Sequence, residues 1–299
     1  MTRTTLTPVH LALAIAVMAV WGSNFVVIKF ALLHLPPLLL ATLRFTVVFL
    51  PAALFVKRPA ASWANLAAYG LLIGVGQFGA LFLALKADVT PGLASLIMQM
   101  QVFFTIGLSM WLTGELIGKV QVAALLLAVA GIGVILTHTD GSITLFGLGL
   151  LLLAALSWAG GNMASRAAGK VDMLGYVVWS SAFAVPPLFL LSLLVEGWPA
   201  IVEGLRAADA TSWAAVAWQA AANALFGYGM WGWLLARYPA ATVAPLALMI
   251  PIFGMGTSAM VLGEPLQPWK LLAAVLVMSG LALGMLWSRL SPRDMAEPI

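Results

Sequence analysis

The sequence contains no cysteine, and charged residues are rare in it. The absence of cysteine excludes disulfide bonds, cysteine-ligated metal ions and thiol catalysis. Charged residues make up only 8% of the 299 residues, whereas soluble domains carry about 25%. Hydrophobic residues account for 63% of the chain. We therefore expect an integral membrane protein with little mass outside the lipid bilayer.

Recognisable catalytic and cofactor motifs are also absent. The patterns His-Glu-x-x-His and Gly-x-Ser-x-Gly do not occur, and no histidine has an acidic partner at helical spacing. The segment Gly74-Val75-Gly76-Gln77-Phe78-Gly79 matches a dinucleotide-binding pattern, but it lies inside an apolar run without the required preceding strand. We therefore predict no enzymatic activity, no cofactor and no metal site. The small net charge of +4 predicts no nucleic-acid partner.

Apolar stretches, in contrast, recur along the whole chain. A membrane-spanning helix needs about 20 predominantly apolar residues. Turn-forming segments such as Leu35-Pro36-Pro37 and Lys57-Arg58-Pro59 separate these stretches. The connection at 196–211 is expected to form a short surface helix. The ten predicted spans cover residues 9–33, 36–56, 63–86, 91–113, 118–137, 146–167, 173–195, 212–236, 240–262 and 268–288.

Basic residues are distributed unevenly between the two ends of these spans. An even number of spans places both termini on one side, and cytoplasmic loops of membrane proteins carry an excess of Lys and Arg. The distribution therefore predicts cytoplasmic termini. The side of the termini collects Arg3, Lys57, Arg58, Lys119, Arg166, Lys170, Arg237, Arg289 and Arg293, and the other side collects Lys86, Arg206 and Lys270, with Lys29 if it snorkels outward.

The two halves of the chain resemble each other. Gly114-Glu115 is followed sixteen residues later by Gly131, and Gly263-Glu264 is followed sixteen residues later by Gly280. A unit of five spans is odd, so a second copy must enter the membrane from the opposite side, as in many secondary transporters. We predict an all-α integral membrane fold of ten transmembrane helices in two inverted five-helix repeats. The first repeat covers residues 1–141 and the second covers 142–299.

Several motifs carry a family resemblance. They are Trp21-Gly22-Ser23-Asn24-Phe25, Leu43-Arg44-Phe45 and the two Gly-Glu pairs with their trailing glycines. In these motifs the chain resembles the EamA-type members of the drug/metabolite transporter superfamily, and among them the bacterial aromatic amino-acid exporters. One departure is Val102, where the family often has proline. The resemblance implies a cavity lined mainly by the first, third, fourth, sixth, eighth and ninth spans.

The resemblance also implies a biological setting. It implies export of amino acids and related metabolites across the bacterial inner membrane by a multi-pass protein. The partners would be small-molecule substrates and the lipid bilayer, with no obligatory protein partner. Transport of a sugar, a nucleotide conjugate or a hydrophobic cation stays an alternative. An intramembrane enzyme is disfavoured because no buried acid, histidine pair or nucleophile arrangement is found, and a passive channel stays open.

Lys29 and Arg44 are the clear charges inside predicted spans. Arg44 follows Pro36 by eight residues, which at a helical rise of about 1.5 Å per residue is roughly 12 Å deep. An arginine at the centre of a span costs about 2.5–3.5 kcal/mol on insertion scales. Attraction of a substrate carboxylate is one interpretation, and a structural role is the other. The structural role is favoured for Arg44, because the family resemblance includes this arginine across varied substrates. Lys29 lies close enough to the surface to snorkel.

Acidic residues are absent from the predicted spans. Ion-driven carriers usually keep an intramembrane carboxylate, so we predict a facilitator or an exchanger driven by its substrate gradient. An anionic or zwitterionic substrate is favoured over a cationic drug. Glu115 and Glu264 lie at span ends and are expected to pair with cations there. Gly70 with Gly74, and Gly280 with Gly284, have the spacing of helix-packing faces.

Neutral polar and aromatic residues are the candidates for substrate binding. A buried amide without a partner is costly, so these amides should face neighbouring helices or a wet cavity, and both interpretations stay open. Aromatic walls would suit an apolar side chain of the substrate. Pro251 is the candidate hinge. The candidate cavity residues are Trp21, Asn24, Gln77, Phe78, Gln99, Phe103, Trp158, Asn162, Asn223 and Tyr228.

Overall fold

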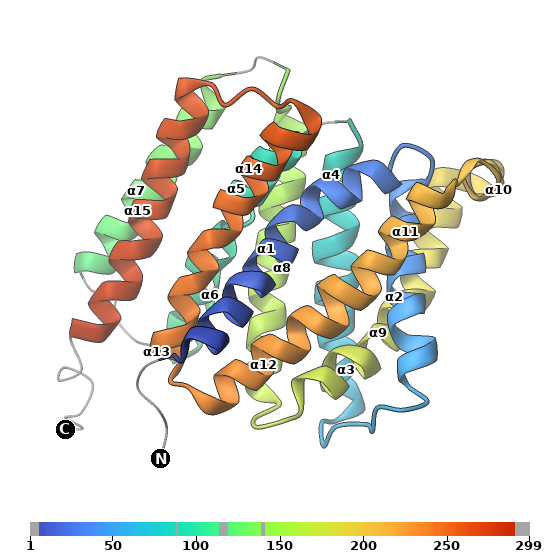
Figure 1. The fold of residues 1–299 in the computed structure, drawn as a ribbon, viewed down its shortest axis with the longest axis horizontal. Helices are drawn as coiled ribbons and strands as arrows, with labels where there is room; N and C mark the ends of the chain where they lie inside the picture. Colours follow the sequence, from blue (N-terminus) through green and yellow to red (C-terminus); the bar gives the residue numbers. More distant parts are fainter. Residues whose placement is uncertain (1–5, 88, 114–118, 139–140, 291–299) are drawn as a thin grey trace.

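The fold is helical throughout the part of the chain that the structure describes. The computed structural model describes residues 6–87, 89–113, 119–138 and 141–290 (Figure 1). Within these residues, an isolated bridge between Val89 and Ile143 is the only β pairing. This confirms the prediction of an all-α fold for the described residues. Gly114 and Glu115 lie outside them.

Each helix corresponds to part of an apolar stretch or to a connection between two stretches. Several long runs are divided by a change in helix type, marked η for π or 3₁₀ geometry. In chain order the elements are α1 (Pro8–Ala31), α2 (Pro37–Ala52), α3 (Trp63–Gly70), η1 (Leu71–Gly79), α4 (Ala80–Ala87), α5 (Pro91–Ile97), α6 (Met100–Thr113), α7 (Lys119–Leu136), α8 (Leu145–Ala167), α9 (Met173–Leu191), η2 (Ser192–Glu196), α10 (Gly197–Ala207), α11 (Ala210–Trp218), η3 (Gln219–Phe226), α12 (Gly227–Arg237), α13 (Ala240–Val243), η4 (Ala244–Leu248), α14 (Met249–Leu262) and α15 (Pro268–Leu290).

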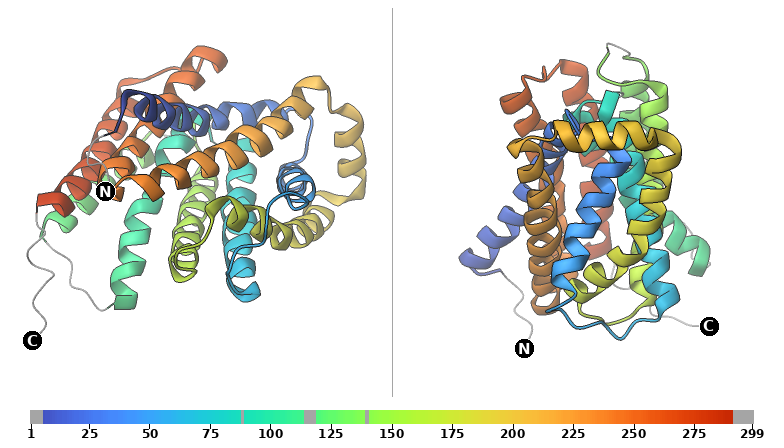
Figure 2. Two further views of the ribbon diagram at one scale, coloured as in Figure 1. Left: turned by 60° about the horizontal axis from the view of Figure 1, so that its bottom comes forward. Right: turned by 90° about the vertical axis from the view of Figure 1, so that its right-hand side faces the viewer.

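Consecutive elements join into helical runs that are long and apolar enough to cross a membrane. Among the described residues, 8 helical runs meet that criterion, and α2 is a shorter apolar helix. The run from α11 through η3 to α12 lies beside α1 (Figure 1). As predicted, the connection after α9 contains a helix, α10. It lies across the end of α2 instead of along the bundle (right view of Figure 2).

Two kinds of helix irregularity occur at corresponding places in the two halves. The third predicted span contains the π-helical segment η1, and the eighth contains the π-helical segment η3. The fourth span is interrupted at Met98 and Gln99, and in the ninth span the short helix α13 is followed by the 3₁₀ segment η4. π-Helical turns often mark functional sites. Interrupted helices at matching positions point to the binding site of a transporter.

Glycines allow neighbouring helices to pack closely. A Cβ atom on Gly74 would lie 2.2 Å from the Cβ atom of Ala184, so η1 and α9 are in direct backbone contact. A Cβ atom on Gly280 would lie 2.6 Å from the carbonyl oxygen of Ala124, which brings α15 against α7. Small residues permit this close approach between helices in membranes. The predicted packing role of these two glycines is therefore confirmed.

A buried carboxylate holds several helices together at one end of the bundle. We call the end where α1 begins and α15 ends the terminal end, and the opposite end the loop end (Figure 1). At the loop end, Glu264 accepts hydrogen bonds from Thr90 Oγ1 at 2.6 Å and from the Gly92 amide at 3.0 Å. It also accepts from Ser258 Oγ at 2.5 Å and from Lys270 Nζ at 3.0 Å. Glu264 thus ties α5 to α14 and α15, and its predicted pairing with a cation is confirmed.

Candidate functional site

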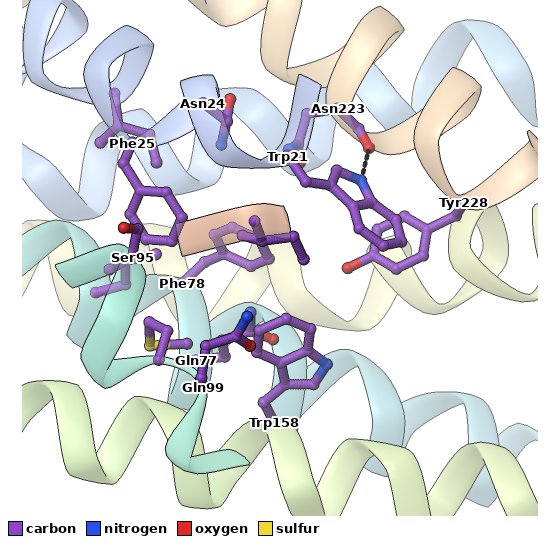
Figure 3. Close-up of a pocket in the computed structure, with 14 residues that line it drawn as sticks. Trp21, Asn24, Phe25, Gln77, Phe78, Ser95, Gln99, Trp158, Asn223 and Tyr228 are labelled. Carbon is purple, nitrogen blue, oxygen red and sulfur yellow. Dashed lines mark hydrogen bonds between the residues drawn. The ribbon is translucent and has the colours of Figure 1, made fainter. Parts of the chain in front are cut away.

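A cavity lies where helices of the two halves meet. Its inner part, the deep compartment, has a volume of about 50 Å³ (Figure 3). It adjoins a wide compartment of about 460 Å³, which falls in the range of about 300–1,000 Å³ usual for ligand pockets. Of the ten candidate residues, the deep compartment is lined by Trp21, Asn24, Gln77, Phe78, Gln99, Trp158, Asn223 and Tyr228.

The irregular helix segments supply several of these side chains. Gln77 and Phe78 are consecutive residues of η1, and Asn223 belongs to η3. Gln99 lies at the interruption between α5 and α6. On the regular helix α1, Trp21 and Asn24 are three residues apart and therefore share a face. Part of the lining of the deep compartment is thus built where the helical pattern changes.

Two of the hydrogen bonds that join the halves are donated by side chains that line the deep compartment. Trp21 Nε1 donates to the carbonyl oxygen of Asn223 at 3.1 Å, as drawn in Figure 3. Gln99 Nε2 donates to the carbonyl oxygen of Ala247 at 3.2 Å. The second bond connects the interruption of the fourth predicted span with the 3₁₀ segment of the ninth. Both bonds therefore depend on the relative position of the two halves.

Two amide oxygens on residues that line the deep compartment lack a hydrogen-bond partner in the described part of the chain. Asn24 Oδ1 and Gln77 Oε1 are buried and accept no hydrogen bond from the described residues. Both side chains are only 3% exposed. A buried polar atom without a partner costs about 1–3 kcal/mol. These two amide groups are therefore able to bind a ligand that supplies hydrogen bonds.

Arg44 lies directly behind the wall of the deep compartment. Its Nη2 atom donates to Asn223 Oδ1 at 3.0 Å, and its Cζ atom lies 3.5 Å from the ring centroid of Phe78. Asn223 and Phe78 both line the deep compartment. Arg44 Nε and Nη1 have no hydrogen-bond partner among the described residues, so Arg44 caps no backbone carbonyl there. Its bond to Asn223 joins α2 to η3, which fits a structural role in anchoring a neighbouring helix. The guanidinium group of Arg44 thus lies next to the deep compartment, but Arg44 does not line it.

Lys29 is engaged elsewhere. Its Nζ atom donates to the carbonyl oxygen of Leu85 at 2.7 Å and to that of Lys86 at 3.2 Å. These carbonyls belong to the last turn of α4, where helix carbonyls lack intrahelical partners. Lys29 lines neither compartment. Lys29 thus caps carbonyl oxygens at the end of α4.

The remaining sequence candidates lie around the deep compartment without lining it. Asn162 lines the wide compartment, where its Nδ2 atom donates to Gln101 Oε1 at 2.9 Å and to Thr105 Oγ1 at 3.1 Å. Phe103 lines neither compartment and instead faces a groove between α6, α7 and α15. Pro251 lies in the first turn of α14, directly after η4.

Some residues that line the two compartments were not predicted from the sequence. Ser95 lines the deep compartment and donates to the carbonyl oxygen of Gly92 at 2.7 Å. It precedes Gln99 by four residues, so helical spacing from that glutamine could have identified it. Gln101 and Thr105 line the wide compartment and share the four-residue spacing. Their common bond to Asn162 has no local signature in the sequence.

Comparison with known proteins agrees with this architecture. The sequence profile of the EamA-like transporter family matches residues 9–137 and again residues 145–286. A probable amino-acid metabolite efflux pump of Salmonella typhimurium is 42% identical over 275 residues, which cover 90% of this chain and 92% of that protein. A protein of the same description from Escherichia coli is 38% identical over 286 residues, covering 93% and 96% respectively.

A solved crystal structure shares the fold. It superposes with a TM-score of 0.62 at 19% sequence identity, over 96% of this chain and 100% of that one. The family and these sequence relatives are transporters, in agreement with the prediction that the protein is not an enzyme. The family match covers most of the chain in two consecutive segments, and the chain therefore belongs to the EamA-like transporter family.

Proposed function

We propose that this protein is a secondary transporter that exports amino acids and related metabolites across the bacterial inner membrane. The central observation is a cavity between the halves whose lining combines unpaired amide groups with aromatic walls. The full-length similarity to two probable amino-acid metabolite efflux pumps supports the choice of substrate.

The chemistry of the cavity fits a zwitterion better than a highly charged substrate. No charged residue is among the described residues that line either compartment. Phosphorylated metabolites are usually held by charge-assisted bonds from several basic side chains. Amide groups such as those of Asn24 and Gln77 can accept hydrogen bonds from an ammonium group and donate to a carboxylate. The rings of Trp21, Trp158 and Tyr228 would receive an aromatic or aliphatic side chain.

The proposed architecture consists of ten transmembrane helices in two inverted repeats, residues 1–141 and 142–299. The ten are the eight long apolar runs, α2, and the run from α11 to α12. Two observations favour the duplication. The family profile matches the chain twice, and π-helical and interrupted segments occur at corresponding places in both halves.

Alternating access would move the two halves about the substrate site. The wide compartment extends toward the terminal end, because its lining includes Ser165 near the end of α8 and Leu235 near the end of α12. At the loop end, Glu264 ties α5 to α14 and α15. With both termini in the cytoplasm, this arrangement corresponds to a state open toward the cytoplasm. Pro251 and the interruption at Gln99 are the proposed hinges.

Counterflow in proteoliposomes tests the function. Vesicles loaded with unlabelled phenylalanine, methionine or threonine should accumulate the same labelled amino acid without an imposed proton or sodium gradient. Trp158→Ala should reduce this exchange because it removes a wall of both compartments. Trp111→Ala is the matched control, because Trp111 is 80% exposed and lines neither compartment. Absence of exchange by the folded wild-type protein would reject the amino-acid assignment, and competition with sugars and nucleotide conjugates would then identify the substrate class.

A further inference from the structure

We propose that Arg44 selects substrates that carry a free carboxylate, acting through Asn223 from behind the cavity wall. This inference rests on the proposed function, and it assigns a specificity-determining role to a residue that no substrate touches directly. It also assigns an orientation to the bound amino acid, whose carboxylate faces Asn223.

Arg44 is a buried positive charge with no acidic partner among the described residues around it. Arg44 is only 1% exposed. Two of the three nitrogen atoms of its guanidinium group, Nε and Nη1, have no hydrogen-bond partner among the described residues. It borders a small cavity of about 10 Å³, and no acidic residue is among the described residues that line this cavity. Tyr69 and Tyr228 are the phenolic residues of that lining. No described carboxylate in this lining therefore balances the positive charge of Arg44.

Only one layer of side chains separates this charge from the deep compartment. Phe78 and Tyr228 line both the deep compartment and the small cavity around Arg44. The guanidinium group stacks on the Phe78 ring, with 3.5 Å between Cζ and the ring centroid. Charges interact more strongly in the protein interior than in water, because the effective dielectric constant is lower. A substrate in the deep compartment would therefore experience a positive potential on this side.

The orientation of the Asn223 amide follows from its contact with Arg44. An asparagine side chain can present either its oxygen or its nitrogen, and the hydrogen-bond network decides which. Arg44 has only donors, so the atom of Asn223 that it contacts at 3.0 Å must be the oxygen Oδ1. The Nδ2 group is then the part of this side chain that remains to donate. Because Asn223 lines the deep compartment, Nδ2 is a donor suited to a substrate carboxylate.

Two residues that line the compartment each have an unpaired amide oxygen, which is an acceptor. Asn24 Oδ1 and Gln77 Oε1 are buried there without hydrogen-bond partners. The α-ammonium group of an amino acid has three donors and would satisfy an acceptor of this kind.

The substitution Asn223→Asp tests this inference with little change of shape. It places a carboxylate on Arg44, cancels the positive potential and removes the Nδ2 donor, while it gives a buried cation its missing partner. The Michaelis constant for phenylalanine should rise by about tenfold or more, equivalent to about 1.4 kcal/mol. Phenylalaninamide, which lacks the carboxylate, should compete as well as before or better. Thermal stability should be kept or increased, which separates loss of selectivity from loss of fold.

A second variant and a control make the test decisive. Arg44→Gln should also abolish the preference for phenylalanine over phenylalaninamide, and Asn65→Asp should keep it, because Asn65 lines neither compartment and bonds Ala164 and Tyr176. If Arg44→Gln fails to fold, Asn223→Asp still decides. Equal discrimination by wild type and Asn223→Asp would overturn the inference. Failure of the wild-type protein to exchange any amino acid would instead reject the proposed function itself.

Discussion

The carboxylate of Glu264 lies 3.0 Å from the ammonium group of Lys270, and these side chains are only 6% and 1% exposed. The same carboxylate binds the amide of Gly92 at the start of α5, in the other half of the chain. Taking two charges out of water is costly, and only good geometry with further hydrogen bonds offsets that cost. Here Thr90 and Ser258 supply those bonds. The buried ion pair therefore links the two halves at the loop end.

Breaking this pair should destabilise the protein strongly. Glu264→Gln leaves the ammonium group of Lys270 buried without a counter-charge, and loss of one partner of a buried ion pair costs about 3–5 kcal/mol. We expect a clear fall in the thermal unfolding temperature of the purified protein. Glu203→Gln is the control, because Glu203 is exposed on α10 and such a change usually stays within about 0.5 kcal/mol. Equal unfolding temperatures for the two variants would contradict the assigned role.

The same carboxylate makes stability depend on pH. Burial alone would raise the pKa of Glu264, but hydrogen bonds from Ser258, Thr90 and Lys270 and the charge of Lys270 outweigh it, so the pKa lies below its ordinary value of 4.5. The folded state therefore binds this proton less readily than the unfolded state. The stabilisation is complete above about pH 4.5 and is lost as the pH falls through the lowered pKa.

Unfolding temperatures of the wild type and Glu264→Gln measured between neutral and acidic pH check this dependence. The advantage of the wild type should be constant near neutral pH and should shrink once the pH falls below 4.5. The sign follows from the lowered pKa, because protonation of the carboxylate makes the wild type resemble the glutamine variant. An advantage that grows on acidification would show that the pKa is raised instead.

Helical spacing and hydropathy predicted the parts of the fold that the bilayer itself dictates. Apolar runs must be helical because no water is present to satisfy the backbone, and the described elements follow those runs. Trp21 and Asn24 were found by spacing along α1, which is regular over 24 residues. Gly74 was predicted as a packing residue, and it contacts Ala184 of α9. These features depend on patterns that are local in the sequence.

Features that depend on irregular backbone or distant contacts escaped prediction. Phe103 was predicted to line the cavity, but it lies on α6 just after the interruption at Met98 and Gln99, and its ring faces a groove near α15. No sequence period reveals where hydrogen bonding shifts from α to π or 3₁₀ geometry. Arg44 binds Asn223, which is 179 residues away. Its partner could therefore be found only from the fold.

Backbone contact at Gly74 predicts a steric effect of a single methyl group. Gly74→Ala would place its Cβ atom 2.2 Å from that of Ala184, so η1 and α9 must separate. Overpacking of this kind costs about 1–3 kcal/mol. The control is Gly256→Ala on α14, where nothing lies within 4 Å of the added atom. Thermal unfolding of both variants should show a loss for the first alone, and a stable Gly74→Ala protein would argue against tight packing here.

Unpaired amides in the cavity predict a conflict between stability and transport. Gln77→Leu removes a buried Oε1 atom that has no partner, so stability should rise by about 1–3 kcal/mol. Exchange of amino acids should fall, because the acceptor for the ammonium group is lost. Gln219→Leu is the matched control: Gln219 is fully buried, neither of its amide atoms has a partner, and it lines neither compartment. It should gain stability and keep its transport rate. Unfolding temperatures and counterflow rates of the two variants therefore separate substrate binding from simple burial, and equal transport by both would remove Gln77 from the site.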